Sequence, residues 1–170
     1  ADFAALEQCS VGMKETKRTQ RQMLIPRMGP QAEVAAAALR GEGFSAEALP
    51  MPTREHVRIG RKHTSGKECV PLMLTLGTML SQVEPHRDSD RLFTFFMPTA
   101  SGPCRFGVYN SLHKIALERE GLGDKVRIVS PGEQNYFAEM SADFSARMWV
   151  AFCTHDLLQG MLLDVRPIEV

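Results

Sequence analysis

The sequence lacks the short motifs that identify a site by spacing alone. Its four cysteines, Cys9, Cys69, Cys104 and Cys153, form no CxxC pair, and its five histidines show neither HxxxH nor HExxH spacing. These absences exclude a compact zinc ribbon and give no support to a zinc enzyme. The sequence also has no P-loop and no GxGxxG segment, so any ATP that the protein uses is expected to bind to another domain.

Charge of one sign and long apolar runs are missing as well. Twenty basic and twenty acidic residues give a formal net charge of zero, which argues against nucleic acid or an acidic membrane as the main partner, because both select basic surfaces. No uncharged apolar run reaches the roughly 18 residues that a membrane span needs, and no signal peptide opens the sequence. We therefore expect a cytoplasmic protein without disulfides.

What the chain does have is enough apolar sequence for one domain. Its 170 residues are 44% apolar, which is sufficient for a buried core. Residues 1–21 show no clear period and are expected to form a loosely ordered N-terminal arm, with the domain itself over 22–170. The sequence starts without Met and ends in DVRPIEV directly after an apolar helical pattern, so we expect this domain to be a fragment of a longer protein.

Short apolar runs alternate with helical patterns along the domain, which is typical of an α/β fold. The pattern predicts strands over 22–26, 46–52, 91–98 and 126–131. It predicts helices from Pro30 to Gly41, from Thr53, over 70–83, over 104–121, and from Ser141 to Val165. Because parallel strands are joined by right-handed crossovers, we expect a three-layer, Rossmann-like (flavodoxin-like) domain with a four-stranded parallel sheet of order 2-1-3-4 and a long C-terminal helix.

Two cysteines stand where helices are predicted to begin. Cys69, in GKECVP, and Cys104, in SGPCRFG, each follow a glycine-bearing turn. A helix N-terminus offers unpaired N–H groups and a positive potential that stabilise a thiolate, and Lys67 and Arg105 add positive charge. The helix after the third strand begins at the carboxyl edge of the sheet, where open α/β folds bind ligands. The residues alone thus leave two interpretations, a metal or cluster site shared by two loops, or two ordinary buried cysteines.

The remaining candidates are weaker. Cys153 lies inside the last predicted helix, with Trp149, Val150 and Leu157 at helical spacing, and is expected to be a core thiol. Cys9 precedes the domain. A basic stretch is expected to be a solvated helix face, with docking to an ATPase domain or to a CoA phosphate as the alternative; it comprises Arg54, Arg58, Arg61, Lys62 and Lys67.

Three segments of the chain resemble a known family. They are IPRMGPQAEVAAAALRGEGFSAEALPMP, GRKHTSGKECVPLMLTLGTML and FFMPTASGPCRFGVYNSLHKIALEREGLGDKVRIVSP. They are similar to the C-terminal part of the large CoA-substrate-specific enzyme activases, which are related to the superfamily of 2-hydroxyacyl-CoA dehydratase components and double-cubane-cluster proteins. The resemblance runs from Met23 to the end of the chain and includes both GKECVP and GPCRFG.

The resemblance implies that Cys69 and Cys104 are cofactor-binding residues, as two metal ligands of an iron–sulfur cluster, of the 4Fe–4S kind, whose third ligand comes from elsewhere. It implies a part in ATP-driven low-potential electron transfer, with ATP on another domain and no independent enzymatic activity here. The implied partners are other domains of the parent activase, a dehydratase or reductase component, and an acyl-CoA. With two ligands only, the isolated domain is not expected to hold the cluster stably.

Two other functions stay open at this point. The domain could be a non-catalytic docking or structural domain, which an exposed apolar face on its last helix would favour. It could also be a CoA-binding module that uses the basic stretch and the helix N-termini.

Overall fold

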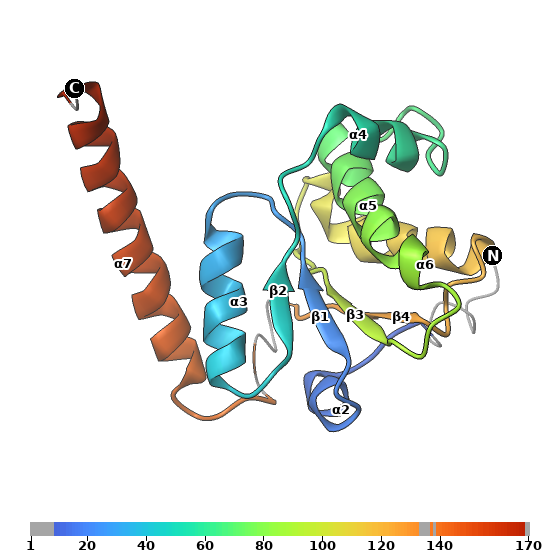
Figure 1. Cartoon of the computed structure of the whole chain (residues 1–170), viewed down its shortest axis with the longest axis horizontal. Coiled ribbons are helices and arrows are strands. Elements are labelled where there is room, and N and C mark those ends of the chain that lie inside the picture. Colours follow the sequence, from blue (N-terminus) through green and yellow to red (C-terminus); the bar gives the residue numbers. More distant parts are fainter. Residues whose placement is uncertain (1–8, 133–136, 138, 169–170) are drawn as a thin grey trace.

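The computed structural model describes residues 9–132, 137 and 139–168, and at its centre lies a four-stranded sheet (Figure 1). The strands are β1 (Gln22–Ile25), β2 (Ala46–Ala48), β3 (Phe93–Phe96) and β4 (Val126–Val129), in the order β2-β1-β3-β4. All neighbouring strands run parallel, and Leu24, for example, pairs with Phe95. The predicted α/β class, parallel sheet and strand order are confirmed.

Each strand is shorter than the apolar run that predicted it. Regular pairing stops one or two residues before a proline in every case, at Pro26, Pro50, Pro98 and Pro131. A proline has no N–H to donate to the ladder, so it suits the end of a strand rather than its interior. The carboxyl edge of the sheet is therefore well defined.

Helices cover both faces of the sheet and make a three-layer, Rossmann-like arrangement (Figure 1). On one face lie α5 (Val70–Val83) and α6 (Tyr109–Arg119), whose apolar residues pack with Leu24 of β1. On the other face lie α3 (Gln31–Gly41) and the long α7 (Phe144–Val165), which pack with Met23 and Ile25. The remaining helices are α2 (Met13–Arg18), α4 (Arg54–Arg61), η1 (Glu84–His86), η2 (Arg105–Val108) and η3 (Arg166–Ile168).

Part of the predicted loosely ordered arm is structured. Residues 13–18 form α2, in which Met13 and Thr16 are buried, and the Thr16 hydroxyl lies 3.3 Å from the hydroxyl of Thr94 in β3. The Ile128 N–H donates to the Cys9 carbonyl, so the chain before α2 runs along β4. A six-residue helix spans too few turns to show a period in the sequence, which is why the pattern did not indicate it. Residues 1–8 lie outside the described residues.

The last helix is attached by only part of its length. Phe144 and Met148, near its start, are buried against the α3 side of the core. Its C-terminal half extends away from the sheet and from α3 (Figure 1). Across the described part of the chain, neither this helix nor any other has the combination of length and apolarity that crossing a membrane requires.

Two glycines allow α4 to cross α5 at very short range. A side-chain carbon at Gly60 of α4 would overlap the carbonyl group of Met73 in α5, and one at Gly77 of α5 would overlap the carbonyl group of His56 in α4. Only glycine can stand at such a backbone contact. The crossing fixes α4 on α5 and thereby anchors the connection over 62–68 that leads to Cys69.

We predict that Gly60→Ala and Gly77→Ala each lower the free energy of unfolding by about 2 kcal/mol or more, because the added methyl group meets backbone that cannot move aside. Urea unfolding followed by circular dichroism measures the change. Gly41→Ala is the matched control, since Gly41 ends α3 with open space around its Cβ position. Equal midpoints for Gly60→Ala and Gly41→Ala would show that the helix crossing is not tight.

Candidate functional site

The two candidate cysteines occupy the N-cap positions of two helices. Cys69 is the N-cap of α5, and Cys104 is the N-cap of η2, which continues directly into α6. Pro71 stands in the first turn of α5, where its missing N–H costs nothing. Gly102, two residues before Cys104, has a φ of +121°, a backbone conformation that favours glycine. The prediction that each cysteine opens a helix after a glycine-bearing turn is confirmed.

Tyr109, the first residue of α6, contacts Cys69. Its hydroxyl oxygen lies 2.6 Å from Cys69 Sγ. Burial raises the pKa of Tyr109 well above its usual value, and the hydrogen bond with Cys69 raises it further. The phenol therefore keeps its proton at neutral pH and donates the hydrogen bond whenever Cys69 is a thiolate. The structure thus links Cys69 at the start of α5 to the start of α6, which lies five residues after Cys104.

The loops that carry the two cysteines also bind one another. The Arg105 guanidinium donates a 2.8 Å hydrogen bond from Nη1 to the carbonyl oxygen of Lys67. The Thr99 hydroxyl donates a 2.8 Å hydrogen bond to the Gly107 carbonyl, which holds η2 against the chain that leaves β3. Arg105 therefore does more than add positive charge, because it joins the start of α6 to the loop before α5.

The two thiols differ in exposure. Cys69 is half-buried and packs against the core cluster beneath α5 and α6, whereas Cys104 is exposed. A pair of ordinary core cysteines would both be buried among apolar side chains. The two cysteines therefore differ from an ordinary buried pair, because Cys104 is open to solvent.

Thiolates beside helix N-termini act chemically as nucleophiles or as metal ligands. A cysteine nucleophile needs a base in reach, and His63, the histidine nearest to Cys69 in the sequence, contacts Glu120 instead, with 3.5 Å between Nδ1 and Oε1. Among the residues that the structure describes, no three His, Cys, Asp or Glu side chains are grouped closely enough to hold a metal ion. To hold a metal ion, Cys69 and Cys104 would need further ligands from outside the described residues.

The other two cysteines lie away from this site. The prediction that Cys153 is a core thiol is wrong, because Cys153 is exposed on α7. Its apolar neighbours Trp149, Val150 and Leu157 are exposed too, so helical spacing correctly grouped them but could not tell a solvent-facing stripe from a core-facing one. Cys9 is buried beside β4, and burial raises the pKa of its thiol.

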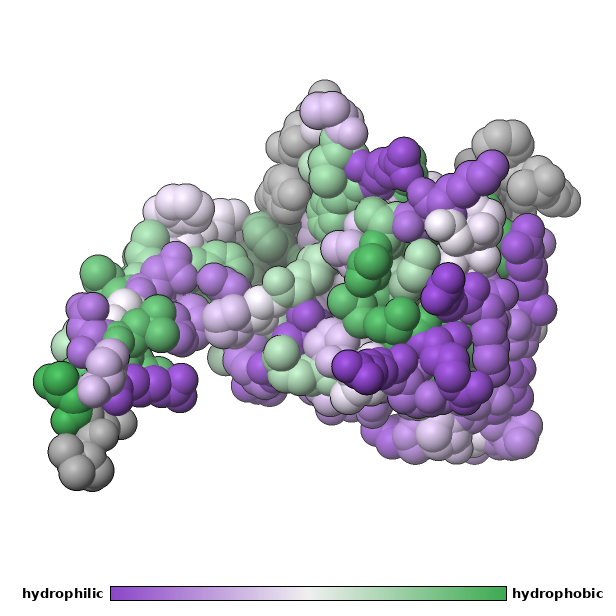
Figure 2. All heavy atoms as spheres, turned by 90° about the horizontal axis from the view of Figure 1, so that it is seen from above, coloured by the Kyte–Doolittle hydropathy of each residue, from purple (hydrophilic) through white to green (hydrophobic). Residues whose placement is uncertain are grey.

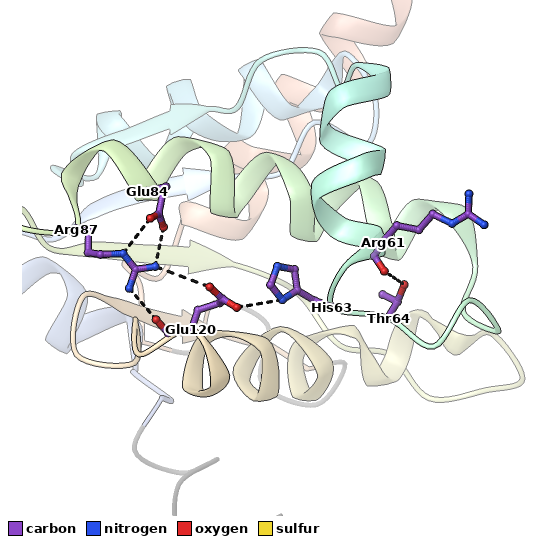
Figure 3. A network of polar contacts seen from close by, with 6 residues as sticks. All are labelled: Arg61, His63, Thr64, Glu84, Arg87 and Glu120. Carbon is purple, nitrogen blue, oxygen red and sulfur yellow. Dashed lines mark hydrogen bonds and ion pairs between the residues drawn. The ribbon is translucent and has the colours of Figure 1, made fainter.

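A network of polar side chains at the C-terminal ends of α5 and α6, beside a cavity, holds the chain segment that leads to Cys69. Arg87 binds Glu84 at 2.8 Å and lies 3.9 Å from Glu120, which His63 also contacts (Figure 3). The cavity has a volume of about 520 Å³ and is lined by Ile59, Lys62, His63, Leu80, Ser81, Glu84, Arg119 and Glu120. Through His63, this network ties the chain after α4 to both helices that carry the thiols.

A buried histidine lies one helical turn beyond Tyr109. His113 Nδ1 is 2.5 Å from the Tyr109 carbonyl oxygen, to which it donates, and the ring stacks on Phe95. Burial lowers the pKa of His113 to about 4. The ring is therefore neutral at pH 7, with its unprotonated Nε2 buried and without a hydrogen-bond partner among the described residues.

Sequence reasoning missed both Tyr109 and His113. The only signal was their spacing of four residues on a helix that begins just after Cys104, which places them on one face of α6. Nothing in the residue types shows that this face turns toward Cys69, since that depends on how α6 packs beside α5.

We predict that the fold loses stability as the pH falls from about 6.5 to 4, with His113 accounting for up to about 3 kcal/mol, because only the unfolded chain binds a proton there in this range. Below pH 4 both states are protonated and the contribution stays constant. Denaturant unfolding at several pH values measures this slope, and His113→Met should reduce it. His86→Asn, at a half-buried histidine, is the control that should retain the slope. Equal slopes for His113→Met and the parent chain would refute the assignment.

The comparisons with known proteins do not assign the chain to a family. No family model, no curated protein and no solved structure matches the chain. Inferences about function therefore rest on the site itself, which consists of two thiols at two helix starts, a phenol that contacts one of them, and an arginine that joins their loops.

Proposed function

We propose that Cys69 and Cys104 supply two thiolate ligands of an iron–sulfur cluster in an activase-like system for ATP-driven low-potential electron transfer. The observation that supports this proposal best is that the loops of two N-cap thiols, far apart in sequence, are joined by the hydrogen bond from Arg105 to the Lys67 carbonyl, while Tyr109 at the start of α6 contacts Cys69. Two thiols that open neighbouring helices at one sheet edge form a surface that a shared ligand can bridge.

The donor set fits this kind of group. Cysteine thiolates are the usual ligands of iron–sulfur clusters, and unpaired N–H groups at helix starts stabilise the negative charge of the sulfurs. When bound, the cluster would supply one-electron transfer at a low potential. Tyr109 would donate a hydrogen bond to the Cys69 sulfur, and Arg105 would hold the two ligand loops in place.

Two thiols do not complete a cluster site, so the proposal includes further ligands from outside the described residues. We assign these to another domain of an activase or to a dehydratase or reductase component, with ATP bound on another domain and an acyl-CoA as the final substrate of the system. The protein itself would carry no independent activity. The same proposal includes a cytoplasmic location and, because the net charge is zero, the absence of a nucleic-acid partner.

A docking or structural role is the second candidate, and the exposed apolar residues of α7 favour it. In that case the two cysteines would bind nothing. The cluster content of the cysteine variants separates these two candidates.

We predict that the protein reconstituted with iron and sulfide without oxygen, with excess dithiothreitol to fill the ligand positions that this chain leaves open, carries both elements, and that Cys69→Ala or Cys104→Ala lowers their content several-fold. Each substitution removes one of only two ligands that the site offers. Iron and sulfide are measured by colorimetric assay together with the visible absorption spectrum. Cys153→Ala is the matched control, because Cys153 is a second exposed thiol on a different helix. Equal iron and sulfide in all three variants would exclude Cys69 and Cys104 as ligands.

We also predict that Tyr109→Phe moves the midpoint potential of the reconstituted cluster to a more negative value. A hydrogen bond to a ligand sulfur stabilises the more negative, reduced state, and the phenylalanine ring keeps the packing while it removes the donor. A redox titration followed by absorbance measures the potential. The iron content should stay the same, and an unchanged potential would show that the Tyr109 hydroxyl donates to no ligand sulfur.

A further inference from the structure

The outward side of α7 carries a continuous apolar stripe, formed by Val150, Cys153, Leu157 and Met161. At 100° per residue these four positions fall within about 80° of one another around the helix. Met148, which is buried against the α3 side of the core, lies on the opposite side of the helix. Leu157 is 71% exposed and Met161 is 64% exposed. Helix α7 therefore packs against the domain with one side and exposes an apolar stripe on the opposite side.

The apolar surface of α7 is large. The large apolar residues that it exposes are Trp149, Val150, Leu157, Leu158, Met161, Leu162, Leu163 and Val165. At about 100 Å² each they total on the order of 800 Å² around the helix, above the roughly 300–600 Å² of the largest apolar patch on a typical monomer. A standard interface takes about 800 Å² from each partner. Figure 2 shows apolar residues, interspersed with polar ones, on the part of the molecule that projects beyond the α/β layers.

Charge is almost absent from this surface. Between Trp149 and Leu163 the sequence has one charged residue, Asp156. Asp156 Oδ1 accepts a hydrogen bond of 3.4 Å from the Gln31 amide of α3, so this carboxylate is directed toward the domain. A partner that covers the stripe therefore needs an equally uncharged apolar face of similar length, and α7 is itself such a face.

We propose that a second copy of this chain covers the stripe, through two α7 helices packed antiparallel about a two-fold axis near His155. In this arrangement Val150 faces Met161 of the second copy, and Cys153 faces Leu157, so that a smaller side chain meets a larger one at each level. A two-fold interface requires a surface that is complementary to itself, and the spacing of the stripe meets this requirement. The spacing of three and four residues is also the one that packs helix against helix.

The pairing places the two α/β domains on the outer sides of the helix pair. Cys69 and Cys104 lie on the helices of the opposite sheet face, so the thiol site stays accessible in the dimer. Dimer formation therefore does not depend on cluster binding, and an experiment can refute either proposal without affecting the other.

Sedimentation velocity from about 1 to about 100 µM tests the proposal, because standard-size interfaces associate within or below this range. The chain should sediment with twice the 18.9 kDa mass of one copy. The double variant Leu157→Glu/Met161→Glu should be monomeric and bind at least about 100-fold more weakly, since it places carboxylates in an apolar interface. The matched control is Met51→Glu/Val108→Glu, two exposed apolar residues outside α7, and it should remain a dimer.

The native cysteines give a second measurement that needs no substitution. Alkylation of Cys153 should slow as the protein concentration rises through the dissociation constant, while the exposed Cys104 keeps its rate. Mass spectrometry of the peptides reports both rates in one sample. A parent chain that stays monomeric at about 100 µM, a Leu157→Glu/Met161→Glu variant that stays dimeric, or a Cys153 rate that does not change with concentration would each overturn the proposal.

Discussion

Parallel pairing of the four strands is the constraint on which the rest of this molecule depends. A parallel sheet needs crossover helices, and each crossover helix must run back against its strands, so helix starts collect at one edge. This geometry brings the start of α5 and the start of η2 together although a strand and a helix separate them in the chain. The contact of Cys69 with Tyr109 and the hydrogen bond from Arg105 to the Lys67 carbonyl both follow from this placement of the helix starts.

The fold could be predicted well because its signals are local and repeat along the chain. The apolar run at β3, the prolines that end strands and the glycines that end helices each act on their immediate neighbours. Features that depend on how the helices pack could not be predicted from the sequence. A six-residue helix such as α2 shows no period, and the same helical spacing describes Cys153 whether its face turns to the core or to solvent.

The candidate site likewise contains residues that the sequence predicted and residues that only the structure showed. Residue types and turn chemistry identified Cys69 and Cys104, because a thiol before a helix is a local feature. Tyr109 and His113 became visible only once α6 was placed beside α5, since their importance lies in what they touch. Gly60 and Gly77 belong to the same group, because their role depends on a crossing between two helices that a one-dimensional pattern does not contain.

Because the two thiols differ in exposure, they differ in how readily they are oxidised. An oxidant dissolved in water reaches the exposed Cys104 before the half-buried Cys69, because thiol oxidation follows access as well as charge. Cys69 stays packed on the core and in contact with Tyr109 while Cys104 reacts. Within this site, oxidation in air therefore starts at Cys104 and reaches Cys69 later.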